Sequence, residues 1–442
     1  MSYLDNILFA LLLILGVSFF TINIRKIIRN IKLGRDVDRS DNKSVRWANM
    51  ARIALGQSKM VKRPVSGILH IIVYLGFVII NIEVLEIIID GLFGTHRIFA
   101  FMGGFYSFLI GAFEIIAFMV LVSVLVFLIR RNIIKLWRFA HSDLKGWPKS
   151  DANYILYFEV VLMTLFLTMN GADLWLQQMG VSHYVEAGSF PISQFIAPVF
   201  NGMSVASVVL IERTAWWLHI TGIIVFLNYL YFSKHLHILL AFPNTYYAFL
   251  GPLGKFNNLE SVTNEVKLMM DPNADPFAAP AADASVAPEK FGASDVQDLN
   301  WVQLLNAYTC TECGRCTSVC PANITGKKLS PRKIMMDTRD RLEEVGKNID
   351  SNSGKFVPDN KTLLHDYITP EELWACTTCN ACVEECPVSI SPLSIIMDMR
   401  QFLVMEQSAA PQPLNAMMSN IENNAAPWPY NQQDRLNWKN EN

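Results

Sequence analysis

The sequence predicts a mainly α-helical protein, in which a bundle of five membrane-spanning helices precedes a small helical domain that contains every cysteine. Three observations support this fold class. Of the 442 residues, 52% are hydrophobic and only 17% are charged, which is more apolar than is usual for a water-soluble protein. Five apolar segments reach the length of about 20 residues that crosses a bilayer. All eight cysteines lie in two short runs after those segments.

The five apolar segments are residues 4–24, 68–89, 98–129, 154–176 and 214–232. The first one follows no basic residue and precedes no small-residue cleavage site, so we interpret it as a membrane anchor and not as a signal peptide. The lipid bilayer is therefore the first expected partner of the chain.

The orientation in the membrane follows from the positions of lysine and arginine. The connection after the first segment carries twelve basic residues, and the connection after the third carries six. The two other connections carry only Arg97 and Arg213. We expect both basic loops, and everything after the fifth segment, on the cytoplasmic side of a bacterial inner membrane, with the N-terminus outside. Clustered thiols also suit a reducing compartment.

Four regions are expected along the chain. Residues 1–241 form the membrane domain, and residues 242–295 form a loop and linker that includes "DPNADPFAAPAADASVAPEKFGASD", which has no helical or strand period. Residues 296–408 form the compact cysteine-containing domain, and residues 409–442 form a polar tail that we expect to be extended. The net charge of −2 gives no basic field for nucleic acid.

The cysteine-containing domain is an internal duplication. Each cysteine run is followed by an amphipathic helical pattern, "SPRKIMMDTRDRLEEV" after the first and "SPLSIIMDMRQFLVMEQ" after the second. A serine before a proline is typical of the first positions of a helix. Each half therefore consists of a cysteine loop and the helix that follows it.

The runs "CTECGRCTSVCP" and "CTTCNACVEECP" share the spacing C-x₂-C-x₂-C-x₃-C-P. In two-cluster ferredoxins, the fourth cysteine of such a run binds the other cluster. We therefore expect two [4Fe–4S] clusters. The ligands of the first would be Cys310, Cys313, Cys316 and Cys386, and those of the second Cys376, Cys379, Cys382 and Cys320. Two structural zinc sites or free buried thiols are the alternatives, and the duplicated Cys-Pro spacing favours clusters.

Three histidines in or beside the apolar segments are candidate haem ligands: His70, His219 and His237. On a continuous helix, the 18 residues between His219 and His237 make five turns, so the two would share one face about 27 Å apart. His70 and His237 would both lie at the cytoplasmic edge, where a haem b could bridge them. The alternative is that these histidines are hydrogen-bonding or interfacial residues. His96 and His183 are candidates only if their loops fold inward.

Four acidic residues fall inside apolar segments, where an unpaired charge is costly. They are Glu83, Glu86, Glu114 and Glu159. One interpretation is that Glu83 and Glu86, with Asp90, approach the outer interface and face water. The other interpretation is a role in proton or quinone chemistry.

These motifs resemble two known families. The region "WVQLLNAYTCTECGRCTSVCPANITGKKLSPRKIMMDTRD", with "EELWACTTCNACVEECPVSI", resembles the ferredoxin domain of heterodisulfide-reductase-like iron–sulfur oxidoreductases. The five-helix part, with its three histidines, resembles the gamma subunit of respiratory nitrate reductase. By this resemblance His237 and His219 match the haem ligands of the last helix, and His70 matches the first of two on the second helix. The other would fall at Ile80, which cannot bind iron, so one haem b between His70 and His237 is favoured.

The resemblance implies an electron-transfer subunit that exchanges electrons between menaquinone and a cytoplasmic partner through haem b and two [4Fe–4S] clusters. Menaquinone would react in the membrane domain near His70, His237 and the last helix. Fused relatives continue beyond this point into a cysteine-rich catalytic domain, so we expect a separate cysteine-rich iron–sulfur or flavoprotein subunit. No catalytic triad, phosphate loop or dinucleotide fingerprint occurs, and no independent active site is expected. The alternative function is a scaffold or ion-conducting subunit with structural or sensory clusters.

Overall fold

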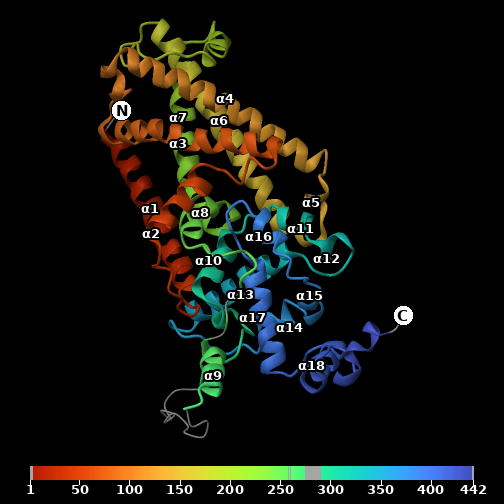
Figure 1. The fold of residues 1–442 in the computed structure, drawn as a ribbon. Helices are drawn as coiled ribbons and strands as arrows, with labels where there is room; N and C mark the ends of the chain where they lie inside the picture. The colour runs from red at the N-terminus through yellow and green to blue at the C-terminus, as the bar shows by residue number, and fades with distance from the viewer. Residues whose placement is uncertain (1–2, 257, 259, 274–289, 441–442) are drawn as a thin grey trace.

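A computed structural model describes residues 3–256, 258, 260–273 and 290–440 (Figure 1). In these ranges the regular structure is helical apart from two isolated β-bridges, which confirms the mainly α fold class. Five helices are long and apolar enough to cross a membrane. They are α1 (Tyr3–Ile31), α3 (Pro64–Phe93), α4 (Gly104–Asn132), α6 (Trp147–Gln178) and α7 (Val205–Tyr229), the last of which a short turn extends to Phe232.

The five long helices pack around a shared apolar core. Phe9, Ile110 and Phe166 come from three different helices and are fully buried there. A side chain at Gly76 would clash with Val120, since an added Cβ would lie 2.5 Å from its methyl carbon. The missing side chain therefore lets α3 and α4 approach closely, as small residues do in membrane bundles.

The fifth span is interrupted before it reaches the cysteine-containing domain. Two 3₁₀ turns, Leu230–Phe232 and Lys234–Leu236, follow α7, and α8 (His237–Tyr246) begins after them. Between the turns, Ser233 is extended, with ψ of 145°. The expectation that His219 and His237 share one face of a continuous helix is therefore wrong.

A carboxylate on α6 stabilises this interruption. Asp151 accepts hydrogen bonds from the Tyr229 hydroxyl at 2.6 Å, the Ser233 hydroxyl at 2.7 Å and the Lys234 amide at 3.2 Å. Backbone amides freed at a helix end need such partners when they are buried. The chain direction after α7 therefore depends on one buried aspartate.

The cysteine-containing domain is built from short helices that position the two loops. In chain order they are α10 (Trp301–Thr309), α11 (Arg315–Ser318), α12 (Pro321–Ile324), α13 (Pro331–Ser351), α14 (Leu363–Asp366), α15 (Pro370–Trp374), α16 (Ala381–Glu385) and α17 (Pro392–Met405). The helices predicted after each cysteine run are α13 and α17. Ser330 and Ser391 cap them, each accepting a hydrogen bond from the amide three residues later.

Short helices in the two basic loops lie at the same end of the bundle as this domain. They are α2 (Lys43–Met50), continued by the π-helical turn Ala51–Leu55, and α5 (Trp137–Ala140). Figure 1 shows the cysteine-containing helices, in teal to blue, below the five long helices. The end of α1 is joined to them by an Asn30–Tyr308 side-chain hydrogen bond of 2.9 Å.

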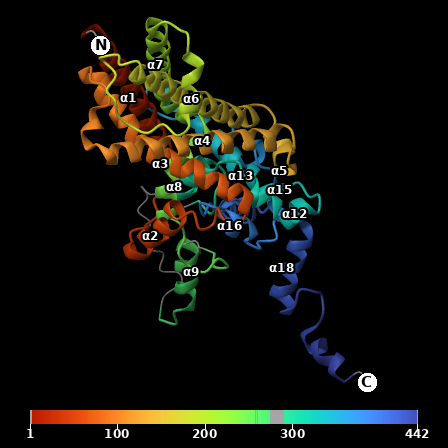
Figure 2. The same cartoon turned by 90° about the horizontal axis from the view of Figure 1, so that it is seen from above.

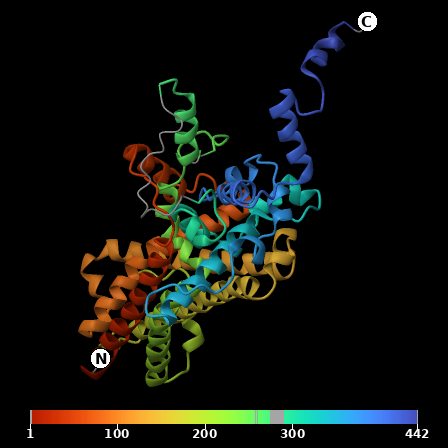
Figure 3. The same cartoon turned by 90° about the horizontal axis from the view of Figure 1, so that it is seen from below.

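Two further helices lie outside the main body. These are α9 (Glu260–Met270) and α18 (Gln412–Asn424), and Figures 2 and 3 show the C-terminal segment projecting away from the rest of the chain. The expectation of an extended tail is wrong, because α18 and the 3₁₀ segment Gln432–Lys439 are helical. Residues 274–289 of the expected linker lie outside the described residues, and the four domain boundaries stay predictions.

The first prediction concerns a fully buried arginine in the cysteine-containing domain. The guanidinium of Arg341 forms ion pairs with Asp295 at 2.8 Å and Asp359 at 2.6 Å. Arg341→Met leaves two carboxylates without their partner, and breaking a buried pair in this way costs about 3–5 kcal/mol. We expect the visible absorbance of the bound clusters to be lost at a lower temperature than in the wild type.

The matched control is Lys328→Met, which removes an exposed ion pair with Glu371. Such a surface pair contributes little to stability, so this variant should lose its absorbance at the wild-type temperature. Equal behaviour of the two variants would contradict the structural role of Arg341.

Candidate iron–sulfur and haem site

The two cysteine loops repeat the same unusual backbone conformation. Glu312 (φ 56°) and Gly314 (φ 72°) in the first loop correspond to Thr378 (φ 56°) and Asn380 (φ 60°) in the second. Left-handed φ values at residues other than glycine are uncommon and cluster at functional sites. In the second loop, this turn brings the Thr378 amide to 3.4 Å from the sulfur of Cys376, to which it donates.

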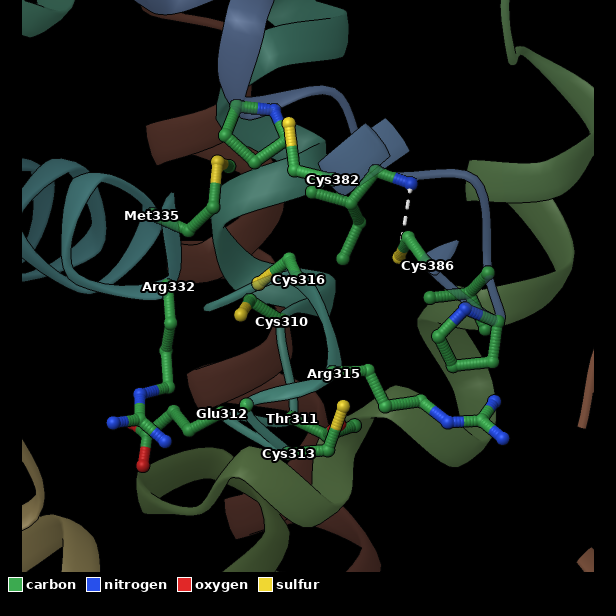
Figure 4. A pocket seen from close by; sticks show the side chains of 15 residues that line it. Cys310, Thr311, Glu312, Cys313, Arg315, Cys316, Arg332, Met335, Cys382 and Cys386 are labelled. Carbon is green, nitrogen blue, oxygen red and sulfur yellow. Dashed lines mark hydrogen bonds between the residues drawn. The ribbon is translucent and has the colours of Figure 1, made fainter. Parts of the chain in front are cut away.

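One set of thiols lines a cavity of about 30 Å³ between the first cysteine run and the residues around α16. Figure 4 shows the side chains of Cys310, Cys313, Cys316 and Cys386 around this space. Cys382 also borders it. The structure thus brings together the three leading cysteines of one run and the last cysteine of the other.

The remaining thiols line a second cavity of about 20 Å³. These thiols are Cys320, Cys376, Cys379 and Cys382. Within the described residues, no group of three or more His, Cys, Asp or Glu side chains is close enough to share a single metal ion. The sulfur atoms instead surround two spaces in an interleaved arrangement.

The chemistry of the lining fits iron–sulfur clusters. Burial raises the pKa of Cys310 and Cys382 to about 12 and that of Cys386 to about 11. Crowded thiolates are therefore unfavourable here unless positively charged iron compensates them. The Ile390 amide donates to the sulfur of Cys386 at 3.3 Å, and hydrogen bonds of this kind tune iron–sulfur centres.

A buried ion-pair network joins the first cysteine loop to the membrane bundle. The Glu312 carboxylate forms ion pairs with Lys234, which follows the break after α7, and with Arg339 of α13 at 2.8 Å. Although burial opposes ionisation, Arg339 and Lys234 hold the pKa of Glu312 below its usual value. The loop that carries Cys310 and Cys313 is thereby attached to the end of the fifth span.

The basic loops provide further contacts with both cysteine runs. The Arg315 guanidinium donates to the carbonyls of Lys59 at 3.2 Å and Met60 at 3.0 Å. Arg63 forms an ion pair with Glu385 at 2.7 Å. From the sequence, these basic residues indicate only the orientation in the membrane. Their contacts are not predictable from it, because the partners are more than 250 residues away.

The loop between α4 and α6 contacts the domain in a similar way. Arg332, at the start of α13, donates to the Arg138 carbonyl at 2.7 Å and to Asp143 at 3.1 Å. Asp143 also accepts a hydrogen bond of 2.6 Å from Ser330, the cap of α13. Both basic loops therefore lie on the side of the bundle that carries the thiols.

Two of the three predicted histidines lie next to each other. The ring centroids of His70 and His237 are 6.4 Å apart. An iron atom bound between two imidazoles separates their centroids by roughly 6 Å, from two metal–nitrogen bonds of about 2 Å and the ring radii. His237 Nδ1 donates to the Lys234 carbonyl at 3.1 Å, which leaves Nε2 available for a metal. His70 Nδ1 is buried with no partner among the described residues.

The third predicted histidine lies elsewhere. His219 is buried on α7, where Nδ1 donates to the Leu162 carbonyl at 3.0 Å and the ring packs against Phe166. The structure does not bring it to the His70–His237 pair. His235, which sequence analysis did not select, has its ring centroid 5.3 Å from that of His237.

Most of the acidic residues of the apolar segments are buried at the opposite end of the bundle, and Glu159 is the exception. Glu83, Glu86 and Asp90 are only 3%, 4% and 7% exposed, so the interpretation that they face water is wrong. Glu114 is fully buried and accepts hydrogen bonds from the amides of residues 192 and 193. Glu159 is partly buried.

Comparisons with known proteins agree with the thiol geometry. Residues 309–390 match the family described as "4Fe-4S dicluster domain". The chain is 30% identical over 470 residues to the probable iron-sulfur-binding oxidoreductase FadF of Bacillus subtilis (strain 168), covering 99% of this chain and 61% of FadF. It is 25% identical over 430 residues to the EtfAB:quinone oxidoreductase of Syntrophomonas wolfei, covering 92% of this chain and 55% of that protein.

A shorter match covers about a third of the chain. The chain is 34% identical over 173 residues to a probable membrane-anchored ferredoxin of Chromohalobacter salexigens, covering 36% of this chain and 25% of that protein. Subunits of heterodisulfide reductases match over similar or shorter stretches. No solved structure matches the chain significantly. The chain spans roughly 55–61% of the length of the two long relatives.

These similarities confirm that the chain resembles membrane-bound iron–sulfur oxidoreductases. It contains a 4Fe-4S dicluster domain, which indicates that it binds [4Fe–4S] clusters. The five apolar helices and the similarity to a membrane-anchored ferredoxin indicate a membrane protein.

The second prediction tests which thiols share a cluster. The double variant Cys310→Ser/Cys386→Ser removes two ligands from the first cavity only, whereas Cys310→Ser/Cys320→Ser removes one ligand from each cavity. We expect the first variant to retain one cluster, with about four iron atoms per chain besides any haem iron, and the second to lose both. The measurement is iron and acid-labile sulfide in the purified variants. The opposite pattern would show that each run holds its own cluster.

Proposed function

We propose that the chain transfers electrons between a quinone in the membrane and a water-soluble partner in the cytoplasm, through haem b and two [4Fe–4S] clusters. The observation that carries the proposal is the short connection between the His70–His237 pair and the first cysteine loop. His237 lies three residues after Lys234, whose side chain forms an ion pair with Glu312 in the first cysteine loop. The relative described as an EtfAB:quinone oxidoreductase supports the choice of a quinone.

The ligands follow from the geometry already described. The thiols around the first and second cavities hold one cluster each, and His70 and His237 hold the haem. When bound, these groups accept and release single electrons without large structural change. The contribution of the chain is to hold them close together, to exclude water from the buried thiols and to supply hydrogen bonds to sulfur.

The two cavities differ in their access to solvent. Cys310 and Cys386 of the first set are buried, whereas Cys379 of the second set is exposed. A water-soluble partner can therefore approach the second set most closely. Asn380, beside Cys379, also lines a large groove whose walls include Arg39 and Arg52. We propose that a separate flavoprotein or cysteine-rich iron–sulfur subunit docks there.

The membrane orientation is part of the proposal. Both basic loops contact the thiol-bearing domain, one through Arg63 and the carbonyl that Arg315 of the domain contacts, the other through Arg138. Because basic loops remain in the cytoplasm, the thiols face the cytoplasm of a bacterial inner membrane. Menaquinone reacts within the five-helix bundle, along the last helix.

One observation favours the alternative of an ion-conducting or scaffold subunit. The acidic residues Glu83, Glu86 and Glu114 are buried together with Arg97 at the end of the bundle opposite to the thiols. Quinol reactivity separates the two functions, because an ion-conducting subunit with structural clusters needs no electron donor.

The third prediction is that a menaquinol analogue reduces the clusters of the purified protein. The expected result is bleaching of the iron–sulfur absorbance on anaerobic addition of the quinol, together with the appearance of a reduced b-type haem band. The proposed function would be contradicted if a preparation with full iron and sulfide content is reduced by dithionite but not by the quinol.

The fourth prediction concerns the haem ligands. His237→Ala should remove the b-type haem band while iron and sulfide content stay at the wild-type level, because His237 does not line either thiol cavity. His219→Ala serves as the matched control, because this buried histidine of the same span lies away from the pair. It should keep the haem band. Loss of the band in His219→Ala alone would contradict the ligand assignment.

A further inference from the structure

A polar cavity of about 30 Å³ lies at the end of the bundle opposite to the thiols. Its walls come from α3, from the turn that follows α3, from α6 and from α7. Charged groups on all four elements face it, which is unusual inside a membrane bundle and indicates a functional site.

Most of these charged groups are held by partners. The Arg97 guanidinium bonds to Asp173 at 2.6 Å, to the Tyr106 hydroxyl at 3.1 Å and to the Asn170 side-chain oxygen at 3.1 Å. On α7, Glu212 forms an ion pair with the neighbouring Arg213 and accepts a hydrogen bond of 2.9 Å from Tyr184.

The other two acids of the cavity wall on α3 are also satisfied. Glu86 accepts hydrogen bonds from the Phe99 amide at 2.9 Å and from Tyr106 at 2.8 Å. Asp90 accepts from the Thr95 hydroxyl at 2.5 Å and from the Arg97 amide at 2.7 Å. These contacts fold the turn after α3 over the end of the bundle.

Glu83 is the exception. It lines the cavity and is 3% exposed, and its Oε2 atom has no hydrogen-bond partner among the described residues. A buried polar group without a partner costs free energy and calls for a specific explanation. Because no hydrogen bond holds Oε2, Glu83 can accept or release a proton there without disrupting the surrounding structure.

A series of titratable groups leads from the cavity to the surface. The Oδ1 atom of Asp173 lies 3.4 Å from His96 Nε2. The ring centroids of His96 and His183 are 5.5 Å apart, and His183 is exposed. A polar cavity of about 30 Å³ has room for water, since one molecule needs about 10–15 Å³ of such space. Glu83 is thereby connected to solvent on the side opposite to the thiols.

We propose that Glu83 exchanges protons between the membrane interior and this surface, through water in the cavity, His96 and His183. The inference rests on the proposed quinone reaction. Oxidation of one quinol to quinone releases two electrons and two protons. The electrons leave one at a time toward the thiol side, and each proton passes from a quinol hydroxyl to the Glu83 carboxylate and then to water at His183. Reduction of quinone uses the same groups in reverse.

The geometry separates the exit of electrons from the exchange of protons. Glu83 follows His70 by 13 positions on α3, which corresponds to about 20 Å along the helix. Electrons therefore leave near one end of the bundle, while protons are exchanged at the other. Trp216 of α7 lines the cavity, so a quinone bound along the last helix can reach the Glu83 end.

The test uses the full chain in phospholipid vesicles with the thiol-bearing domain facing outward. The bilayer contains a menaquinol analogue, the lumen contains a pH-sensitive dye, and ferricyanide outside accepts the electrons. Two ferricyanide ions are reduced for each quinol oxidised, and vesicles without protein give the background. We expect the wild type to acidify the lumen. Glu83→Gln should slow both acidification and ferricyanide reduction at least tenfold, with unchanged iron and sulfide.

Glu159→Gln is the matched control, since Glu159 is also an acid within a span but does not line the cavity. It should behave as the wild type. If Glu83→Gln does not retain its clusters, His183→Gln, at the exposed end of the path, is tested in its place. This variant should acidify the lumen more slowly than the wild type. If the folded Glu83→Gln variant, or His183→Gln in its place, acidifies the lumen as fast as the wild type, the proton path is wrong. The proposed electron transfer would then still stand. Failure of the wild type to reduce ferricyanide would overturn the proposed function as well.

Discussion

The arrangement of the whole chain depends on the pairing of a few buried charges at the junction between bundle and thiol-bearing domain. The Glu312 carboxylate and the Lys234 ammonium are 2% and 8% exposed, and a charge buried in this way needs its partner. Their ion pair, extended by Arg339, fixes the first cysteine loop against the break after α7. The same break presents His237 to His70. One local constraint therefore positions thiols and histidines relative to each other.

The opposite ends of the bundle use buried charge in different ways. At the junction, ion pairs and hydrogen bonds from both basic loops hold two parts of the chain together. At the other end, Arg97 holds Asp173 and the turn after α3 in place, and Glu83 is left without a partner. Paired charges there build the walls of a cavity, and the unpaired carboxylate is the group that can change its protonation without cost to the structure. The proposed separation of electrons and protons follows from this asymmetry.

Local signals in the sequence predicted the five spans, the helices α13 and α17 and the grouping of the thiols. Hydrophobic length, a Ser-Pro start and a fixed cysteine spacing are properties of short segments. The interruption after α7 was missed because it depends on Asp151, about 80 residues earlier in the chain. The burial of Glu86 and Asp90 was missed for a similar reason, since backbone amides of the following turn satisfy them. The helix α18 was missed because its sequence is polar and it packs on little else.

The most direct test of the central claim is the content of iron, acid-labile sulfide, zinc and haem per chain in the full-length protein purified without oxygen. We expect about eight cluster iron atoms and about eight sulfides, because each of the two interleaved thiol sets holds one [4Fe–4S] cluster. We also expect one haem, at the bis-histidine site, and no zinc. Stoichiometric zinc without sulfide would contradict the account.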